Sequence, residues 1–247
     1  MTMLIVKKFG GTSVADKERI FNVAKRCLED YNKGNDVVVV LSAMGKHTDE
    51  LIRQAKEINP NPSEREMDML LSIGEQMSVA FMAMALETMD IPVVSLNAYQ
   101  AKINTTSEHG NAKITSIDTD RITEELKERK IVIVTGFQGV AENGDITTLG
   151  RGGSDTTAVA LAAALNADAC EIYTDVDGVY TADPRKVSTA KKLAVISYDD
   201  MLHMALNGAE VLHSRCVELA KRFNIPLVVR SSMNRTEGTV VKGYAAC

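Results

Sequence analysis

Residues 4–20 read "LIVKKFGGTSVADKERI", and this stretch decides which fold the chain adopts. Its first residues form an unbroken apolar run, which is typical of a strand that is covered on both faces. Two lysines and a glycine pair follow, and a helical pattern begins directly after them. A buried strand that leads through a short loop into a helix is the repeating unit of parallel α/β proteins.

Strand-helix alternation continues along the whole chain. Apolar runs predict strands at 3–6, 36–44, 91–96, 130–137, 169–176 and 225–232. Helical patterns lie at 16–32, 48–58, 63–89, 117–129, 154–166, 197–206 and 208–223. This order predicts an α/β fold, with a mainly parallel sheet and helices on both sides. No linker or repeat interrupts it, so we interpret residues 1–247 as one continuous domain.

The composition is that of a globular protein and excludes several classes of function. Of the 247 residues, 45% are apolar, which is enough for a large core. The formal net charge of -5 argues against a general nucleic-acid-binding protein. No signal peptide is recognisable, and no apolar run reaches the roughly 18 residues of a membrane helix. The four cysteines and four histidines lack metal-ligand spacing, so we expect a cytoplasmic protein with reduced thiols and no metal site of its own.

The methionine-rich segment 65–90 is expected to form a long, mostly buried helix. Ser63 is its expected N-cap, with Glu66 three residues further on. The pair Gly74-Glu75 is unusual there, because glycine weakens a helix and a buried carboxylate needs a partner. Residues 105–114 are expected to form an exposed loop or short hairpin, and "ENGD" at 142–145 a hairpin turn.

Four junctions share one property: a predicted strand ends, and glycine, hydroxyl or charged residues follow at once. In parallel α/β sheets, ligands bind outside the carboxyl ends of the strands. The first junction is "KFGGTS" at 8–13, where Gly10 and Gly11 permit close approach of an anion and Lys8 adds positive charge. A structural tight turn is the alternative there. The second is "LSAMGKHTDEL" at 41–51, where Thr48 is either an N-cap or a ligand contact.

The third junction, "TTLGRGGSDTTA" at 147–158, gives the strongest signal. Three glycines surround Arg151, and Ser154 and Asp155 open an alanine-rich helix. Asp155 alone would suit the positive end of that helix, but the glycines around an arginine predict an anion site.

The fourth junction is "YTDVDGVYTADPRKV" at 173–187, whose aromatic, acidic and basic residues fit a nucleotide with its phosphates and Mg²⁺. The spacing of an EF-hand calcium loop is absent.

Six motifs together identify a family. They are "KFGGTSV" (8–14), "SAMGKHTDEL" (42–51), "GE" (74–75), "TTLGRGGSDTTA" (147–158), "YTDVDGVYTADPR" (173–185) and "VRSSM" (229–233). In this order they resemble the aspartate kinases (aspartokinases) of the amino-acid kinase family, over nearly the whole chain. Kinases of uridylate, glutamate, acetylglutamate or carbamate share the fold and some glycine loops, but not this full set. The resemblance implies a three-layer α/β/α sandwich around a mainly parallel sheet of about eight strands, with an N-terminal amino-acid-binding lobe and a C-terminal nucleotide-binding lobe.

The resemblance also implies a reaction and a site. ATP, with Mg²⁺ held mainly by its phosphates, would phosphorylate the side-chain carboxylate of L-aspartate, the entry step to lysine, threonine and methionine. Lys8 is expected to contact the transferring phosphate, and Asp155 to orient the cationic groups around it. The implied aspartate-binding residues are Thr48, Glu75, Arg151, Gly152 and Ser154. The implied nucleotide-binding residues are Lys8, Phe9, Gly10, Gly11, Ser13, Thr174, Asp175, Tyr180, Thr181, Ala182, Asp183, Pro184 and Arg185.

The chain also departs from the family pattern. Aspartate kinases usually continue into paired regulatory domains, so residues 1–247 are either a catalytic piece or a catalytic-only form; the family implies a homodimer. Glu210 stands where relatives often have lysine, and Ser214 where they often have proline. Two alternatives stay open: a kinase of the same fold with another acceptor, and a non-catalytic nucleotide or amino-acid sensor. The chain retains four charged site residues that a sensor would be expected to have lost in part, which favours catalysis. They are Lys8, Glu75, Arg151 and Asp155.

Overall fold

A single large sheet organises the molecule, which we describe from a computed structural model for residues 2–184, 186–208 and 211–243. Among these residues the sheet has eight strands, in the order β10-β12-β11-β9-β1-β2-β6-β3. Their bounds are β1 (Leu4–Phe9), β2 (Asp36–Leu41), β3 (Val93–Leu96), β6 (Ile131–Thr135), β9 (Ala169–Thr174), β10 (Val195–Ser197), β11 (Leu227–Ser231) and β12 (Thr239–Lys242). The six neighbours from β11 to β3 are mutually parallel, while β12 pairs antiparallel with β11.

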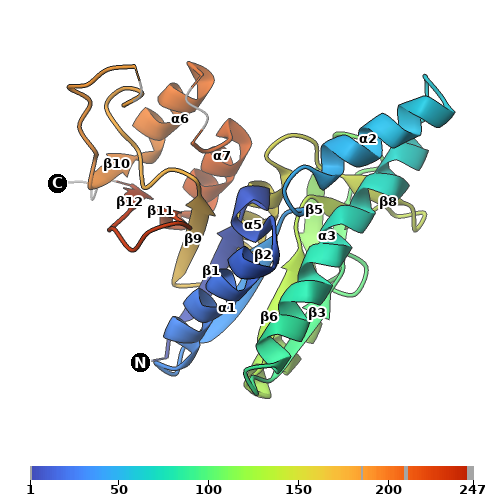
Figure 1. Ribbon diagram of the computed structural model, residues 1–247, viewed down its shortest axis with the longest axis horizontal. Coiled ribbons are helices and arrows are strands. Elements are labelled where there is room, and N and C mark those ends of the chain that lie inside the picture. Colours follow the sequence, from blue (N-terminus) through green and yellow to red (C-terminus); the bar gives the residue numbers. More distant parts are fainter. Residues whose placement is uncertain (1, 185, 209–210, 244–247) are drawn as a thin grey trace.

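Helices cover both faces of this sheet (Figure 1). They are α1 (Lys17–Tyr31), α2 (His47–Ile58), α3 (Glu64–Glu87), α4 (Asp120–Lys127), α5 (Gly153–Ala164), α6 (Tyr198–Leu206) and α7 (Ser214–Phe223), with a short 3-10 helix η1 (Gly11–Val14) after β1. Alternate residues of β2 separate the two cores: Val37 and Val39 pack on the α1 and α3 side, whereas Val38 and Val40 pack on the α5 side. The three-layer α/β/α sandwich is therefore confirmed, and unalternating valines reflect a strand buried on both faces.

The predicted strands and helices all exist, with corrected boundaries. The six predicted strands belong to the large sheet; the short strand β10 at its edge and β12 beside it were not predicted. The last helix begins at Ser214 rather than at 208. Thr48 is not an N-cap, because α2 already begins at His47 and its N-cap, Lys46, makes no side-chain capping bond. Ser63 does cap α3, since its side chain accepts a hydrogen bond from the Glu66 backbone N–H.

A second, smaller sheet stands beyond the carboxyl edge of the large one. It consists of β4 (Ile103–Thr105), β5 (Ile114–Ile117), β7 (Gln138–Val140) and β8 (Ile146–Thr148), in the order β5-β4-β7-β8. The pair β4 and β5 is antiparallel, so the short hairpin expected at 105–114 is present. The pair β7 and β8 is also antiparallel, and "ENGD" forms the turn between them.

Helix α3 is more exposed than the sequence predicted. It is long and apolar enough to cross a membrane by length and composition, yet half of its most apolar stretch is buried inside the protein. The core helix of a globular protein passes the same test, so this is weak evidence for a membrane segment.

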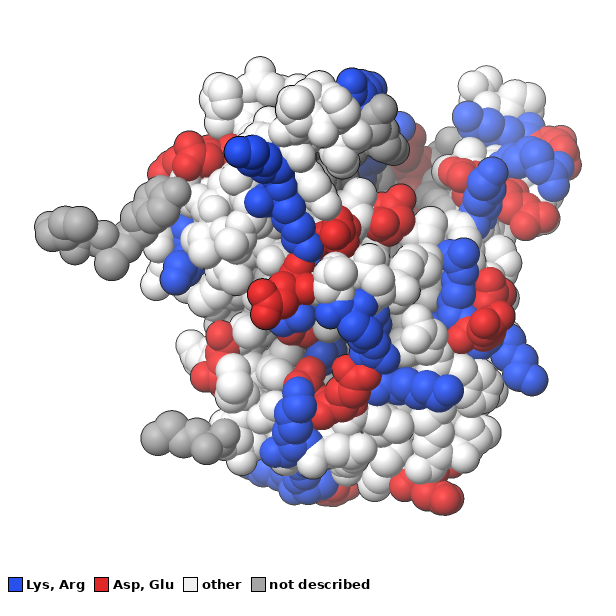
Figure 2. Space-filling view, turned by 60° about the vertical axis from the view of Figure 1, so that its left-hand side comes forward, with Lys and Arg blue, Asp and Glu red and all other residues white. Residues whose placement is uncertain are grey.

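On the face seen in Figure 2, Lys and Arg are interspersed with Asp and Glu rather than gathered into one field.

Candidate active site

A cleft of about 1070 Å³ lies at the carboxyl edge of the large sheet. Eight of the predicted site residues line it together, although they come from four separate segments of the chain. They are Lys8, Gly11, Thr48, Glu75, Arg151, Gly152, Ser154 and Asp155. The parallel order of β1, β2 and β6 explains this convergence, because their carboxyl ends deliver the following loops to one edge.

Lys8 and Asp155 form the charged centre of the cleft. Lys8 is the fifth residue of β1, and its Nζ lies 2.6 Å from Oδ1 of Asp155 in the first turn of α5. Both side chains are mostly buried, with exposed fractions of 11% and 14%. Asp155 therefore fixes the position of the lysine ammonium, and the positive end of α5 adds to the same positive potential.

Two glycines bring the junction loops into contact beside this pair. A Cβ on Gly11 would lie 2.6 Å from the Ala43 carbonyl oxygen, so a side chain is excluded there. The Gly11 carbonyl accepts a hydrogen bond of 3.0 Å from the Gly45 backbone N–H. The loop after β1 and the loop after β2 thus pack backbone against backbone, which is what the glycines at these junctions make possible.

Glu75 is the buried carboxylate of the cleft. It is 3% exposed, and its Oε1 accepts a hydrogen bond of 3.0 Å from the Ala43 backbone N–H. Its Oε2 is buried without a hydrogen-bond partner among the described residues. Burial raises the pKa of Glu75 to about 8. Gly74 precedes it because a Cβ there would lie 2.7 Å from the Cβ of Ala43, so the close approach of α3 to this loop requires glycine.

The glycine loop at 149–153 is held in a strained shape that only glycine adopts easily. Gly150 and Gly152 have φ angles of 73° and 69°, in the left-handed region. A Cβ on Gly152 would lie 2.4 Å from the Cβ of His213, so the loop packs directly against the residues that start α7. Arg151 projects from this loop into the cleft with an exposed side chain.

Two site residues were missed by the sequence analysis. Arg215 of α7 donates to the Leu149 carbonyl and to Oδ1 of Asn111, both at 2.7 Å, and so joins the glycine loop to the β4–β5 hairpin. Asp68 is 1% exposed and accepts hydrogen bonds of 2.9 Å from the backbone N–H groups of Gly110 and Thr148. Asp68 could have been found from the sequence, because it is a second carboxylate in the same apolar helix, seven residues before Glu75. No local sequence pattern indicated Arg215.

The predicted nucleotide-binding residues do not line this cleft, apart from Lys8 and Gly11. Ser13 is buried in η1, and its Oγ has no hydrogen-bond partner among the described residues. The side chain of Phe9 is fully buried and stacks on Tyr173 with ring centroids 4.4 Å apart. Any ligand contact of Phe9 must therefore come from its backbone.

The remaining nucleotide-binding candidates lie at the end of β9, the neighbour of β1, and in the loop after it. They are Thr174, Asp175, Tyr180, Thr181, Ala182, Asp183 and Pro184; Arg185 and Glu210 lie outside the described residues. Thr174 donates from its hydroxyl to Asp175 Oδ1 at 3.0 Å, and Tyr180 donates to Asp177 Oδ1 at 2.9 Å. An antiparallel bridge between Tyr180 and Lys192 closes the loop. These groups thus lie on an ordered loop beside β1, the strand that carries Lys8.

The fold and this site define a class of protein. Residues 3–231 match the amino acid kinase family, and the chain belongs to that family.

Within it, the chain is similar to several aspartokinases. The chain is 62% identical to an aspartokinase of Geobacillus stearothermophilus over 97% of its length, and it spans only 59% of the length of that relative. It superimposes on aspartate kinase from Synechocystis with a TM-score of 0.88 and 51% identity, covering 98% of this chain and 40% of the other. For E. coli aspartokinase III in complex with aspartate and ADP, the TM-score is 0.84 at 32% identity, covering 98% and 65% of the two chains.

Proposed function

We propose that this chain is the catalytic part of an aspartokinase, which transfers the γ-phosphoryl group of ATP to the side-chain carboxylate of L-aspartate. The product is 4-phospho-L-aspartate, the entry compound to lysine, threonine and methionine. The observation that carries the proposal is one cleft that contains a fixed cation, Lys8, an exposed cation, Arg151, and a buried carboxylate with an unpartnered oxygen, Glu75. The similarity to aspartokinases over 97% of the chain supports the choice of substrate.

The charges of the cleft match those of free aspartate. Glu75 is the partner for the α-ammonium group, because its Oε2 is buried without a partner and gains one when the substrate binds. Arg151 is the partner for the α-carboxylate, since a guanidinium binds a carboxylate through two parallel hydrogen bonds. Thr48, Gly152 and Ser154 line the same cleft and complete the amino-acid side.

The substrate side chain needs no general base. A carboxyl with an ordinary pKa of about 3.9 is already ionised at neutral pH and can attack phosphorus directly. The obstacle is repulsion between this carboxylate and the phosphates. Lys8, held by Asp155 at 2.6 Å, and the N-terminus of α5 offset that repulsion at fixed positions, which is the usual means of catalysis in phosphoryl transfer.

The nucleotide is assigned to the loop after β9 and to the glycine loop after β1. Gly10, Gly11 and Ser13 lie next to Lys8 in the chain, and the unpartnered Ser13 hydroxyl suits a phosphate oxygen. Among the described residues no group of three His, Cys, Asp or Glu side chains is arranged to hold a metal ion. We therefore assign Mg²⁺ to the phosphates themselves, where it neutralises part of their charge when bound.

Two other functions compete with this proposal. A non-catalytic sensor would have no need of the Lys8–Asp155 pair, yet the pair is intact. A kinase of the same fold that phosphorylates a nucleotide would be expected to lack Glu75 or Arg151, whose charges fit an amino acid. Glutamate carries the same charges as aspartate, so the choice between these two acceptors rests on the similarity to aspartokinases. The proposal also includes a cytoplasmic location, which the reduced, scattered cysteines favour.

The test is an acceptor assay that traps the acyl phosphate. Incubation with aspartate, MgATP and hydroxylamine is expected to yield aspartyl hydroxamate. Glutamate and UMP serve as competing acceptors in parallel reactions. If glutamate or UMP is phosphorylated readily while aspartate gives no product, the acceptor is wrong; if nothing is phosphorylated but ligands bind, the sensor is the better description.

A further inference from the structure

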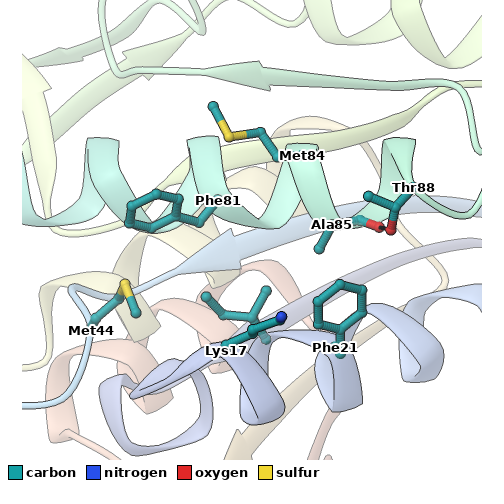
Figure 3. Close-up of a pocket in the computed structure, with 8 residues that line it drawn as sticks. Lys17, Phe21, Met44, Phe81, Met84, Ala85 and Thr88 are labelled. Carbon is teal, nitrogen blue, oxygen red and sulfur yellow. Dashed lines mark hydrogen bonds between the residues drawn. The ribbon is translucent and has the colours of Figure 1, made fainter.

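The buried face of α3 is divided into an apolar half and a polar half. From Val79 onward all of its buried side chains are apolar. A groove of about 310 Å³ between α1 and α3, shown in Figure 3, lies beside this half. Before Val79 the helix buries Asp68, Ser72 and Glu75 almost completely, with exposed fractions of 1%, 1% and 3%. Burial of polar groups is costly unless they are hydrogen-bonded, so the polar half must have specific partners.

Asp68 has four hydrogen-bonding partners, and all of them belong to the smaller sheet or its hairpin. Its Oδ2 accepts hydrogen bonds from the backbone N–H groups of Gly110 and Thr148, both at 2.9 Å. Its Oδ1 accepts one from the Thr148 hydroxyl at 2.5 Å. Nδ1 of His109 lies 3.2 Å from Oδ2. One carboxylate therefore ties α3 to the β4–β5 hairpin and to the end of β8.

A second contact joins the same elements. The side-chain amide of Gln138 in β7 donates to the Ser72 carbonyl at 2.9 Å. Asp68, Ser72 and Glu75 follow each other at helical spacing on one face of α3. The first two positions of this face are occupied by the smaller sheet, and the third, Glu75, is left with an unpartnered oxygen among the described residues.

The elements that Asp68 holds are those that carry Arg151. Thr148 ends β8, three residues before Arg151. The Thr148 carbonyl accepts a hydrogen bond of 2.9 Å from the Ala112 backbone N–H, so the hairpin and β8 move together. A Cβ on Gly150 would lie 3.0 Å from the Gly110 carbonyl oxygen, so the glycine loop also rests on the segment that Asp68 binds. Asp68 thus connects the helix of Glu75 to the loop of Arg151.

We propose that Asp68 is a positioning residue for the amino-acid substrate, and that it sets the separation between Glu75 and Arg151. The inference rests on the proposed function, in which these two groups bind the α-ammonium and the α-carboxylate. Both substrate groups are attached to one carbon, so their two partners are useful only at one separation. Asp68 does not bind the substrate itself, because its oxygens are occupied by donors of the chain.

The first experiment compares Asp68→Ala with Asp68→Asn in the hydroxamate assay. Asp68→Ala is expected to raise the KM for aspartate about thirtyfold and to lower kcat less than about threefold, since misplaced binding groups weaken capture of the substrate. The KM for ATP should stay constant, because among the described residues Asp68 contacts none of the segments assigned to the nucleotide.

Asp68→Asn is expected to recover most of the loss. The amide oxygen can accept from both backbone N–H groups, and the amide NH₂ can donate to the Thr148 hydroxyl, which also accepts. A direct contact between Asp68 and the substrate ammonium would need the negative charge. Equal losses in Asp68→Asn and Asp68→Ala would therefore overturn the positioning role, as would an unchanged KM in Asp68→Ala.

Met82→Ala is the matched control for loss of stability. It removes a fully buried apolar side chain from the same helix and should lower the urea midpoint, yet leave the KM for aspartate unchanged. A rise in KM equal to that of Asp68→Ala would mean that any loosening of α3 disturbs the site, and would overturn the inference. If Asp68→Ala does not fold, Thr148→Val gives the same comparison. It removes only the hydroxyl that donates to Oδ1, and it should raise the KM for aspartate several-fold at constant KM for ATP.

Wild-type protein assayed in parallel separates this inference from the proposed function. If wild type gives no aspartyl hydroxamate, the proposed function is wrong and the inference falls with it. If wild type is active and Asp68→Ala or Thr148→Val has the same KM for aspartate, only the inference is wrong.

Discussion

Two consecutive lysines of β1 point to opposite faces of the sheet and have different environments. Lys7 is 1% exposed, and its Nζ lies 2.6 Å from Asp30 Oδ2 and 2.8 Å from Glu171 Oε2. Burial lowers its pKa, but the neighbouring carboxylates outweigh burial and raise the pKa of Lys7 overall. Among the described residues Lys8 has one carboxylate partner, Asp155, and it otherwise faces the cleft.

The difference teaches how to separate a structural ion from a catalytic one. The charge of Lys7 is fully compensated within the chain, so the lysine ties β1 to α1 and β9 and has nothing left to offer a ligand. Lys8 is held at one point while the rest of its charge faces the cleft. Sequence alternation alone produces this division, because successive residues of a strand face opposite sides.

The largest effect is expected for Lys8→Ala. Turnover should fall about 10³-fold, roughly 4 kcal/mol of transition-state stabilisation, because Lys8 is the only cation that pairs with Asp155 in the part of the chain that the structure describes. The substitution also leaves the mostly buried Asp155 carboxylate without its ion-pair partner, so the urea midpoint should fall as well, and kcat is compared on the folded variant. The measurement is kcat in the hydroxamate assay together with urea unfolding. Wild-type turnover in this variant would remove Lys8 from the mechanism.

Lys7→Met is expected to lower stability without the loss of turnover. Removing the ammonium leaves Asp30 and Glu171 without their main buried partner, and breaking a buried ion pair in this way costs about 3 kcal/mol or more. Turnover of the folded variant should stay within a few-fold of wild type. Urea unfolding and kcat at low temperature check the two parts. A loss of turnover as large as that of Lys8→Ala would make both lysines catalytic and break the comparison.

Glu75 extends the comparison to carboxylates. Because burial raises its pKa to about 8, the free protein holds Glu75 largely protonated at pH 6. An ammonium binds the ionised form, so the KM for aspartate should fall as pH rises from about 6 toward 8. In Glu75→Gln the KM should be raised about 10²-fold and should lose this pH dependence. A KM that is flat with pH in wild type would contradict the assigned ammonium contact.

The same residue gives a stability prediction of defined sign. The folded-state pKa of about 8 lies above the ordinary value of 4.5, so the folded chain retains a proton that the unfolded chain releases. Raising pH through this window therefore destabilises wild type. Glu75→Gln should gain stability over wild type progressively between pH 4.5 and about 8, and the gain should level off above. Urea midpoints of both proteins across this range measure it.

Local patterns predicted the parts of the molecule that are determined by local chemistry. The six long strands, the Ser63 cap and the convergence of Lys8, Arg151 and Asp155 follow from apolar runs, capping residues and parallel order. The exposed face of α3 was not predicted, because an apolar helix has the same sequence pattern whether or not the core covers all of its faces.

Long-range side-chain contacts also escaped prediction. The Lys7 network joins residues up to 166 positions apart, and no local pattern marks such a contact. Short strands such as β10 and β12 carry too few residues for a periodic signal. The sequence was therefore enough to place the site at the carboxyl edge of the sheet. It was not enough to predict which distant side chains hold the residues of that edge in position.

Arg215 holds the glycine loop in position, and its substitution should have the smallest effect on the kinetics. Its guanidinium donates to the Leu149 carbonyl and to Asn111, so it positions the glycine loop that carries Arg151 without lining the cleft itself. Arg215→Ala should raise the KM for aspartate about tenfold and lower kcat less. Arg215→Lys should recover part of the loss, because one ammonium can still reach the carbonyl. Asn111→Ala keeps the carbonyl bond and should have a smaller effect than Arg215→Ala. If instead Arg215→Ala reduced kcat as strongly as Lys8→Ala while KM stayed constant, Arg215 would act on the transferring group, and the division between groups that contact ligand and groups that hold them would have to be redrawn.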